Sequence, residues 1–279
     1  MKYFLPCLSF FVLYGCVTVP KTSVWFPFEM YNNQVVVDIA VKGHPVKALI
    51  DTGASMTVID KKLAVFLNIK SDLSGHTSTI ASSDKTDFAV GVPFSFYGED
   101  IKHNVAIRNL SGVGWKVLLG SSLLKGVVVE FDFPGRRMRF HDLGGKRHQS
   151  PTKPIKLIKN NSLYYTILNI DGIPRKFLID TGAVFPLAVP SSRAEIEKNI
   201  SDGKSSIKIM GAHNEETEGY IDVANPFAIG SYTFSKAKIA YYDRKSGAYI
   251  EGILGMGLFK SLTLIIDVQN NEMYLEAYE

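Results

Sequence analysis

The chain has 279 residues, of which 46% are hydrophobic and 21% are charged, and its formal net charge is +4. This length allows two domains of modest size, each with its own apolar core. The small, dispersed charge and the lack of an aromatic and basic cluster argue against nucleic acid as a partner. No run of about 18 apolar residues is present, so the sequence predicts no full membrane span.

The first residues have the features of a targeting segment. Lys2 is followed by an apolar run over residues 3–14 and then by Cys16, which predicts a secretory signal. Residues 13–16 (LYGC) resemble the lipobox of bacterial lipoproteins, although Tyr14 stands where a small residue is usual. The resemblance implies lipidation at Cys16 and a membrane-anchored lipoprotein of the periplasm or cell envelope. A plain cleaved signal and an uncleaved anchor are the alternatives.

The number and spacing of cysteines and histidines limit which catalytic and metal-binding chemistry the chain can perform. Cys7 and Cys16 are the only cysteines, and both lie in the leader. The folded part therefore has no disulfide framework and no thiol nucleophile. The six histidines show no pair spaced as metal ligands, and we expect no metal site and no cofactor. A serine hydrolase is disfavoured because no Gly-x-Ser-x-Gly motif is present.

Local patterns predict strands, turns and one short helix in the first half. Residues 34–40 and 46–50 predict two strands joined by a turn. Helical apolar spacing predicts a short helix over residues 61–67. Alternation at 136–140 places the arginines of that strand on its solvent face. Further strands are expected over residues 56–60, 76–80, 88–96, 102–107 and 127–133.

One string occurs twice in the chain. LIDTGA occupies residues 49–54 and again residues 178–183, which lie 129 positions later. Other landmarks follow in the same order, namely a strand at 163–170, a helix at 192–199, and hairpin arms at 206–210 and 220–223. The repeat predicts two similar halves of all-β class. We predict a leader at 1–16, an N-terminal domain at 30–143, a linker at 144–160 and a C-terminal domain at 161–279.

The repeated segments resemble a known family. LIDTGAS at 49–55, LIDTGAV at 178–184, and the runs VLLGS at 117–121 and GILGM at 252–256 resemble the pepsin and retropepsin superfamily of aspartic proteases. The resemblance covers about residues 34–279. It implies a bilobal fold of two pseudo-twofold-related, barrel-like domains with a short helix in each. It also implies a monomeric endopeptidase that acts on peptide or protein substrates.

The resemblance assigns roles to particular residues. Asp51 and Asp180 would form a dyad that shares a proton and activates a water molecule. Thr52 and Thr181 would lock the two loops together. The glycines at 53 and 182 would let the backbone approach the carboxylates. Hairpins at about 76–90 and 208–222 would close over an extended substrate. The implied supporting glycines are Gly53 and Gly182. The implied substrate-binding residues are Ser55, Ala81, Ser82, Ser83, Ala212 and His213.

One departure from the family pattern concerns the residue after each LIDTGA string. Ser55 of the first half corresponds to Val184 of the second, so the second half lacks a polar contact. A different class of function also stays open, namely a binding module with this fold that grips an extended peptide without cutting it. Two intact Asp-Thr-Gly sequences favour the protease. A binding module without catalytic activity would gain nothing from two carboxylates that repel each other at short distance.

Overall fold

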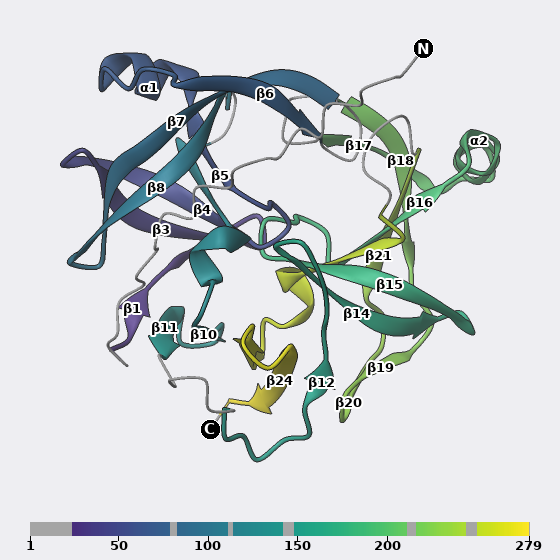
Figure 1. The fold of residues 1–279 in the computed structure, drawn as a ribbon. Helices are drawn as coiled ribbons and strands as arrows, with labels where there is room; N and C mark the ends of the chain where they lie inside the picture. The colour runs from purple at the N-terminus through teal and green to yellow at the C-terminus, as the bar shows by residue number, and fades with distance from the viewer. Residues whose placement is uncertain are drawn as a thin grey trace, which may run out of the picture.

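In the computed structural model, the described residues are 24–78, 83–110, 114–141, 148–210, 216–243 and 250–278. Of these residues, 59% lie in strands and 10% in helices, which confirms the predicted all-β class. Figure 1 shows the strands of the first half on the left, those of the second half on the right, and a smaller sheet below them.

The first half is built around an eight-stranded sheet. An additional pairing of β3 with β7 turns this sheet back on itself, which confirms a barrel in the first half. Alternate residues of β3 and β4, such as Val35 and Ile50, enter the main core, and Val36 and Leu49 on the opposite face enter a second apolar cluster, so both faces are covered near the end of β4. In spatial order its strands are β2 (Glu29–Tyr31), β3 (Gln34–Val41), β4 (His44–Asp51), β9 (Val117–Gly120), β5 (Thr57–Asp60), β8 (Glu99–Arg108), β7 (Ser83–Phe96) and β6 (Leu73–Ser78).

The second half repeats this strand order. Its sheet runs β13 (Ile158–Asn160), β14 (Leu163–Ile170), β15 (Ile173–Asp180), β22 (Gly252–Gly255), β16 (Leu187–Ser191), β21 (Lys238–Asp243), β18 (Glu216–Val223) and β17 (Ser205–Met210). A separate hairpin of β19 (Phe227–Ile229) and β20 (Tyr232–Phe234) belongs to this half and was not predicted from the sequence.

A six-stranded sheet joins the two halves. Its order is β1 (Phe26–Pro27), β11 (Arg137–His141), β10 (Val128–Asp132), β23 (Leu262–Asp267), β24 (Glu272–Ala277) and β12 (Ile155–Lys156). The closing hairpin of each half pairs with the other through β10 and β23, where Glu130 faces Ile265. The predicted linker, residues 144–160, includes β12 and β13, and the predicted domain boundaries stay predictions.

Each half has one short α-helix, as predicted. The helix α1 (Lys61–Phe66) begins at Asp60, whose carboxylate accepts the backbone N–H groups of Lys62 and Leu63. In the second half, α2 (Arg193–Ser201) begins at Ser192, whose hydroxyl accepts the N–H of Glu195. Such caps pair N–H groups that a helix leaves free at its start. Single 3₁₀ turns, η1 (Ser121–Leu124) and η2 (Met256–Leu258), follow β9 and β22. No helix among the described residues is long and apolar enough to cross a membrane.

One apolar core runs through both halves. It includes Ile50 and Phe131 of the first half and Ile179 and Leu264 of the second, each at most 1% exposed. Because the largest apolar cluster is continuous from one half to the other, burial of apolar surface fixes how the halves sit against each other.

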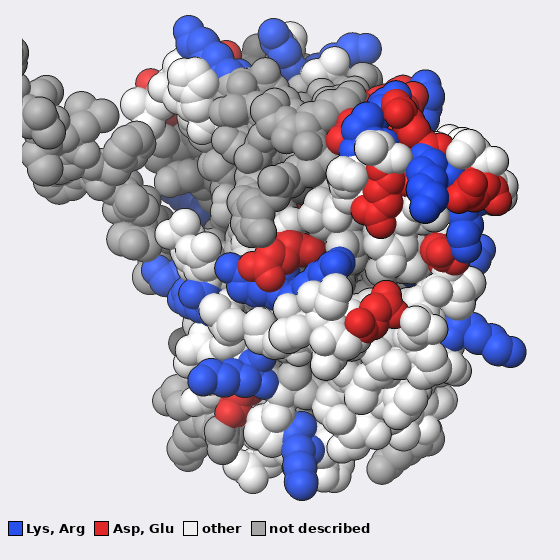
Figure 2. Space-filling view, turned by 90° about the vertical axis from the view of Figure 1, so that its right-hand side faces the viewer, with Lys and Arg blue, Asp and Glu red and all other residues white. Residues whose placement is uncertain are grey.

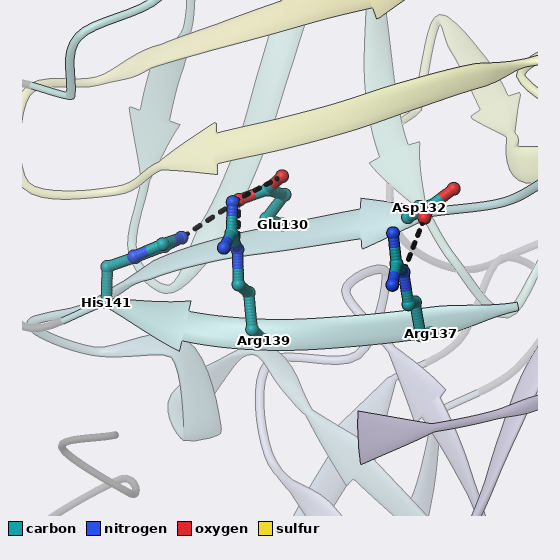
Figure 3. A network of polar contacts seen from close by, with 5 residues as sticks. All are labelled: Glu130, Asp132, Arg137, Arg139 and His141. Atoms are coloured by element: carbon teal, nitrogen blue, oxygen red, sulfur yellow. Dashed lines mark hydrogen bonds and ion pairs between the residues drawn. The ribbon is translucent and has the colours of Figure 1, made fainter. Parts of the chain in front are cut away.

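The arginines of β11 lie on one face of the strand, but they are paired with buried acids and are not simply solvated. Figure 3 shows Arg139 and His141 directed at Glu130, and Arg137 directed at Asp132. Both carboxylates are buried, at 6% and 3% exposure. Burial by itself would raise the pKa of Glu130. Hydrogen bonds from His141 and Arg139 outweigh it, and the pKa lies below its ordinary value.

We expect Arg139→Met to lower the free energy of unfolding by about 3 kcal/mol at neutral pH, because it removes a two-pronged partner from a buried carboxylate. Arg139 donates to both oxygens of Glu130, at 2.7 and 3.1 Å. The measurement is urea unfolding of the variant and of the double variant with Glu130→Gln. The double variant should lose less than the sum of the two single losses. Simple additivity would contradict the pairing.

His103 in β8 is a buried titratable group with an unpaired nitrogen. It is 2% exposed, its ring lies edge-on to Phe94 at 5.6 Å, and Nε2 has no hydrogen-bond partner within the described part of the chain. Burial lowers the pKa of His103 to about 4. Folding therefore keeps this ring neutral at pH values where the unfolded chain takes up a proton.

The free energy of unfolding should consequently decrease in acid because of His103. As pH falls from the unfolded value of 6.5 towards 4, protonation of the unfolded chain favours unfolding, by about 3 kcal/mol in total. Denaturant unfolding of the parent and of His103→Leu across this range measures it. The stability difference should move in favour of the variant by that amount as pH falls. A difference that is constant with pH would show that His103 does not titrate as described.

Candidate active site

The two repeated loops begin at the ends of corresponding central strands. Asp51 is the last residue of β4 and lies beside Gly120 of the parallel strand β9. Asp180 is the last residue of β15 and lies beside Gly255 of β22 in the same way. The apolar runs that end in glycine thus support the two loops from behind. The strands around each aspartate are buried, so each carboxylate is held at the edge of a rigid sheet.

The threonines that follow the two aspartates lock the loops together. The N–H of Thr52 donates to Oγ1 of Thr181 at 3.0 Å, and the N–H of Thr181 donates to Oγ1 of Thr52 at 3.1 Å. Each hydroxyl donates in turn to a carbonyl of the opposite strand, Ile179 at 2.7 Å and Ile50 at 2.5 Å. Both threonines are buried. The four hydrogen bonds tie one half of the chain to the other at the point where the carboxylates emerge.

Thr181→Val should lower the free energy of unfolding by about 3 kcal/mol, since it leaves the buried N–H of Thr52 and the buried carbonyl of Ile50 without their partner. Thr181→Ser keeps the hydroxyl and is the matched control. Chemical denaturation of both variants measures the effect. A Thr181→Val variant as stable as the parent would mean that these hydrogen bonds do not stabilise the junction.

The glycines of the two loops lie against the opposite carboxylates. A Cβ atom on Gly53 would stand 2.5 Å from Cγ of Asp180, and one on Gly182 would stand 2.7 Å from Cγ of Asp51. Each glycine also donates its N–H to the aspartate of its own loop, at 2.9 and 2.8 Å respectively. Glycine is therefore required at both positions for the close approach.

The two carboxylates form one electrostatic unit. Burial and then the charge of Asp180 raise the pKa of Asp51 well above its ordinary value. Burial also raises the pKa of Asp180, and hydrogen bonds from Gly182, Asp51 and Ala183 oppose that rise. The charge of Asp180 raises the pKa of Asp51, so ionisation of one carboxyl group disfavours ionisation of the other. The pair therefore titrates jointly, with one proton shared over a range of pH.

The residues predicted to bind substrate fall into two groups. Ser55 is exposed beside the first loop, and its counterpart Val184 is 43% exposed. The side chain of Ser83, which begins β7, and all of Ala81 and Ser82 lie outside what the structure describes, as do Ala212, His213 and Cys16. The arms of the two predicted flaps are present as β6 paired with β7 and β17 paired with β18.

Two residues beside the second loop were missed by the sequence interpretation. Gln34 donates from Nε2 to the carbonyl of Gly182 at 2.6 Å. Asn33 donates from Nδ2 to the carbonyl of Val184 at 2.7 Å. They lie outside the LIDTGA string, so the motif does not point to them. When the two halves are aligned at the offset of 129 positions, Gln34 corresponds to Leu163, and this loss of a polar side chain is the signal that the sequence offers.

A polar hollow on the outer side of the second half is separate from this dyad. It has a volume of about 610 Å³ and is lined by charged residues that include Arg175, Arg193 and Glu251, but by neither aspartate of the loops. Figure 2 looks onto this side, where acidic and basic side chains are interleaved. Arg193, for example, pairs with Glu197 and Glu218. Because charges of both signs are paired here, this face is neither predominantly acidic nor predominantly basic.

Two segments of the chain match models of known protein families. Residues 37–126 match the family described as gag-polyprotein putative aspartyl protease, and residues 166–258 match the family described as aspartyl protease. The protein belongs to the retropepsin-like aspartyl proteases and carries two such domains in one chain. No curated protein matches it. The predicted resemblance is thereby confirmed.

Proposed function

We propose that the chain is an aspartic endopeptidase whose single catalytic site takes Asp51 from the first domain and Asp180 from the second. One observation carries the proposal: two half-buried aspartates, one from each half, meet at the junction of the two locked loops, each against the glycine of the opposite loop. Membership of the aspartyl proteases supports peptides or proteins as the substrate class.

The proposed chemistry needs only these two groups and water. The ionised carboxylate takes a proton from a water molecule, whose oxygen attacks the carbonyl carbon of the peptide bond. The protonated carboxyl gives its proton to the carbonyl oxygen. The carboxyl group that took the proton from water passes it to the leaving nitrogen, and collapse of the tetrahedral intermediate breaks the C–N bond while the other carboxylate recovers a proton from the hydroxyl. Ser55 is proposed to hold the substrate backbone on the side of the first loop, and the two hairpins are proposed to cover the substrate.

The experiment that tests this proposal is cleavage of a peptide library by the purified chain over about pH 3 to 8, because the pKa values of both aspartates lie above the ordinary value. Asp51→Asn and Asp180→Asn are the controls. The proposal requires cleavage by the parent and its loss in both variants. Cleavage by the variants at the parent's rate would reject it. Binding of peptides without cleavage at any pH would favour the alternative, a peptide-binding module.

The location of the enzyme is a separate proposal. We propose that Cys16 is lipid-modified and holds the catalytic domains at a bacterial membrane facing the periplasm, which the LYGC segment at residues 13–16 supports. Mass measurement of the mature chain tests it: a lipid-modified Cys16 as the first residue is expected. A mature chain that begins elsewhere, or retains Met1, would contradict it. Cys16→Ser should then move the protein from the membrane fraction to the soluble fraction.

A further inference from the structure

The outer side of α1 carries two large apolar side chains. Val65 is 70% exposed and Phe66 is 65% exposed, and these are the highest values among the large hydrophobic side chains of the described residues. Leu63 and Ala64 of the same helix are buried in the core. Single exposed apolar side chains are ordinary on protein surfaces, whereas contiguous ones mark sites of interaction.

Basic side chains flank this apolar pair. Lys61 and Lys62 begin the helix and Lys70 follows it, and all three are exposed. None of the three forms an ion pair within the ranges that the structure describes. Lys42 approaches from the turn between β3 and β4, where its ammonium group donates to the carbonyl of Leu67 at 2.8 Å. The apolar pair therefore lies among positive charges.

The acidic residues closest to these lysines in the sequence bind backbone groups. Asp60 is 1% exposed, and its carboxylate accepts N–H groups of the first helical turn and of Leu110. The carboxylate of Asp72 accepts the N–H of Val90 at 2.8 Å. The first turn of the helix contains no acidic residue. The exposed charge of α1 is therefore positive.

Neighbouring groups hold Phe66 at the surface. The ring of His44, the first residue of β4, lies edge-on to the ring of Phe66, with 5.1 Å between the centroids. The end of the helix is fixed as well, because the N–H of Ile69 donates to the carbonyl of Ala64 at 2.8 Å. A surface that is already ordered loses little conformational entropy when it binds a partner.

The second half shows that the fold does not require such a surface. The helix α2 follows β16 as α1 follows β5, so the two helices occupy corresponding places in the duplicated chain. Charged side chains of opposite sign pair on the outside of α2, where Arg193 contacts Glu197 and Glu218, each at 2.7 Å. Of the two helices, α1 alone exposes large apolar side chains.

We call Lys61, Lys62, Val65, Phe66 and Lys70 the α1 surface. We propose that the α1 surface docks the protein onto an anionic phospholipid membrane. Its apolar pair enters the headgroup region, and its lysines lie near the lipid phosphates. Apolar burial at the interface and attraction to anionic lipid are the two forces that hold peripheral segments at membranes. The formal net charge of +4 acts in the same direction.

Shape and size favour a membrane over a protein as the partner. Figure 1 shows α1 at the outer margin of the first half, beyond the strands of its sheet. A stable protein interface uses about 20 to 30 residues from each partner, whereas the α1 surface has five. The contact does not depend on peptide cleavage. Together with the lipid proposed at Cys16, it would supply the second of the two attachments that stable membrane binding requires.

The variant Phe66→Trp keeps an aromatic side chain in the surface and makes it a fluorescent probe. Tryptophan emission of the full chain with Cys16→Ser is measured during titration with two kinds of vesicle, pure phosphatidylcholine and phosphatidylcholine with about 30% of the anionic lipid phosphatidylglycerol. Subtracting the emission of the chain without Phe66→Trp removes the signal of Trp25 and Trp115. Ile173→Trp is the matched control, because Ile173 is 50% exposed in the second half. Any binding through residues 1–16 is common to all variants.

Anionic vesicles should shift the emission of Phe66→Trp to shorter wavelength, because the indole ring leaves water for the membrane interface. Ile173→Trp should show no shift. In the Phe66→Trp chain, replacing Lys61 and Lys62 together by Gln should raise the half-saturating lipid concentration about 20-fold, since each lysine near the surface contributes about fivefold. Val65→Ser should raise it about fivefold, because less apolar surface is buried.

Three results would overturn the inference. The first is an emission of Phe66→Trp that anionic vesicles do not shift, which would leave a protein as the candidate partner of α1. The second is an equal shift in Ile173→Trp, because contact with lipid would then not be specific to α1. The third is an equal response to neutral and anionic vesicles, because the lysines would then have no role in docking.

Discussion

Asp51→Asn and Asp180→Asn are each expected to lower kcat by about 10²- to 10⁴-fold, because each removes one of the two groups proposed to exchange protons with water and substrate. An amide cannot take a proton from water at these pH values, and it cannot donate one as a carboxylic acid does. The measurement is kcat on the best peptide of the parent. Activity that survives in either variant would mean that the site needs only one of these carboxylates.

The same two variants should be more stable than the parent at neutral pH. Because folding raises the pKa of both aspartates, the folded chain holds protons that the unfolded chain releases above its ordinary pKa of 3.8. The stability of the parent is therefore greatest below that pH, with respect to this pair, and declines as pH rises through the raised values. Denaturant unfolding at pH 3 and pH 7 should give a larger gain for the Asn variants at about pH 7. A gain that is the same at both pH values would contradict raised pKa values.

Gly53→Ala is expected to abolish measurable cleavage. The added methyl group would lie 2.5 Å from Cγ of Asp180, a distance that forces the carboxylate or the loop to move, and displacement of about 1 Å at a reacting group costs about 10²-fold or more in rate. Gly114→Ala is the control, because no atom lies within 4 Å of its added carbon and its φ is not positive.

Both glycine variants can be compared by kcat/KM and by denaturant unfolding. The control should resemble the parent in both measurements. Activity equal to that of the parent in Gly53→Ala would show that the close approach of this glycine to Asp180 is not needed for cleavage.

Much of the fold could be predicted because the sequence contains it twice. The short helices, the hairpin arms and the glycine-terminated runs recur at a nearly constant offset, and local patterns are sufficient to place them. The sheet that joins the halves could not be predicted in the same way. Its central pairing, β10 with β23, joins segments more than a hundred residues apart, and local sequence carries no signal for the partner of a strand.

The site was predictable to the extent that it is symmetric. The repeated string identified the aspartates, threonines and glycines, whose contacts follow from the meeting of two copies of one loop. The contact of Gln34 with the Asp180 loop was not predictable, because it depends on a turn that reaches across the junction from outside the string. Asymmetry in a duplicated site arises from such side-chain differences, and it becomes visible only when the two halves are superimposed in space.

We propose that one chain supplies both carboxylates of a single peptide-cleaving site. Cleavage rate per mole of chain, measured as the parent is diluted from micromolar to nanomolar concentration, tests it most directly. We expect a rate per mole that does not change with dilution, because the site is complete within one chain. A rate per mole that falls in proportion to concentration would show that two chains must associate, and absence of cleavage at every concentration would contradict the claim outright.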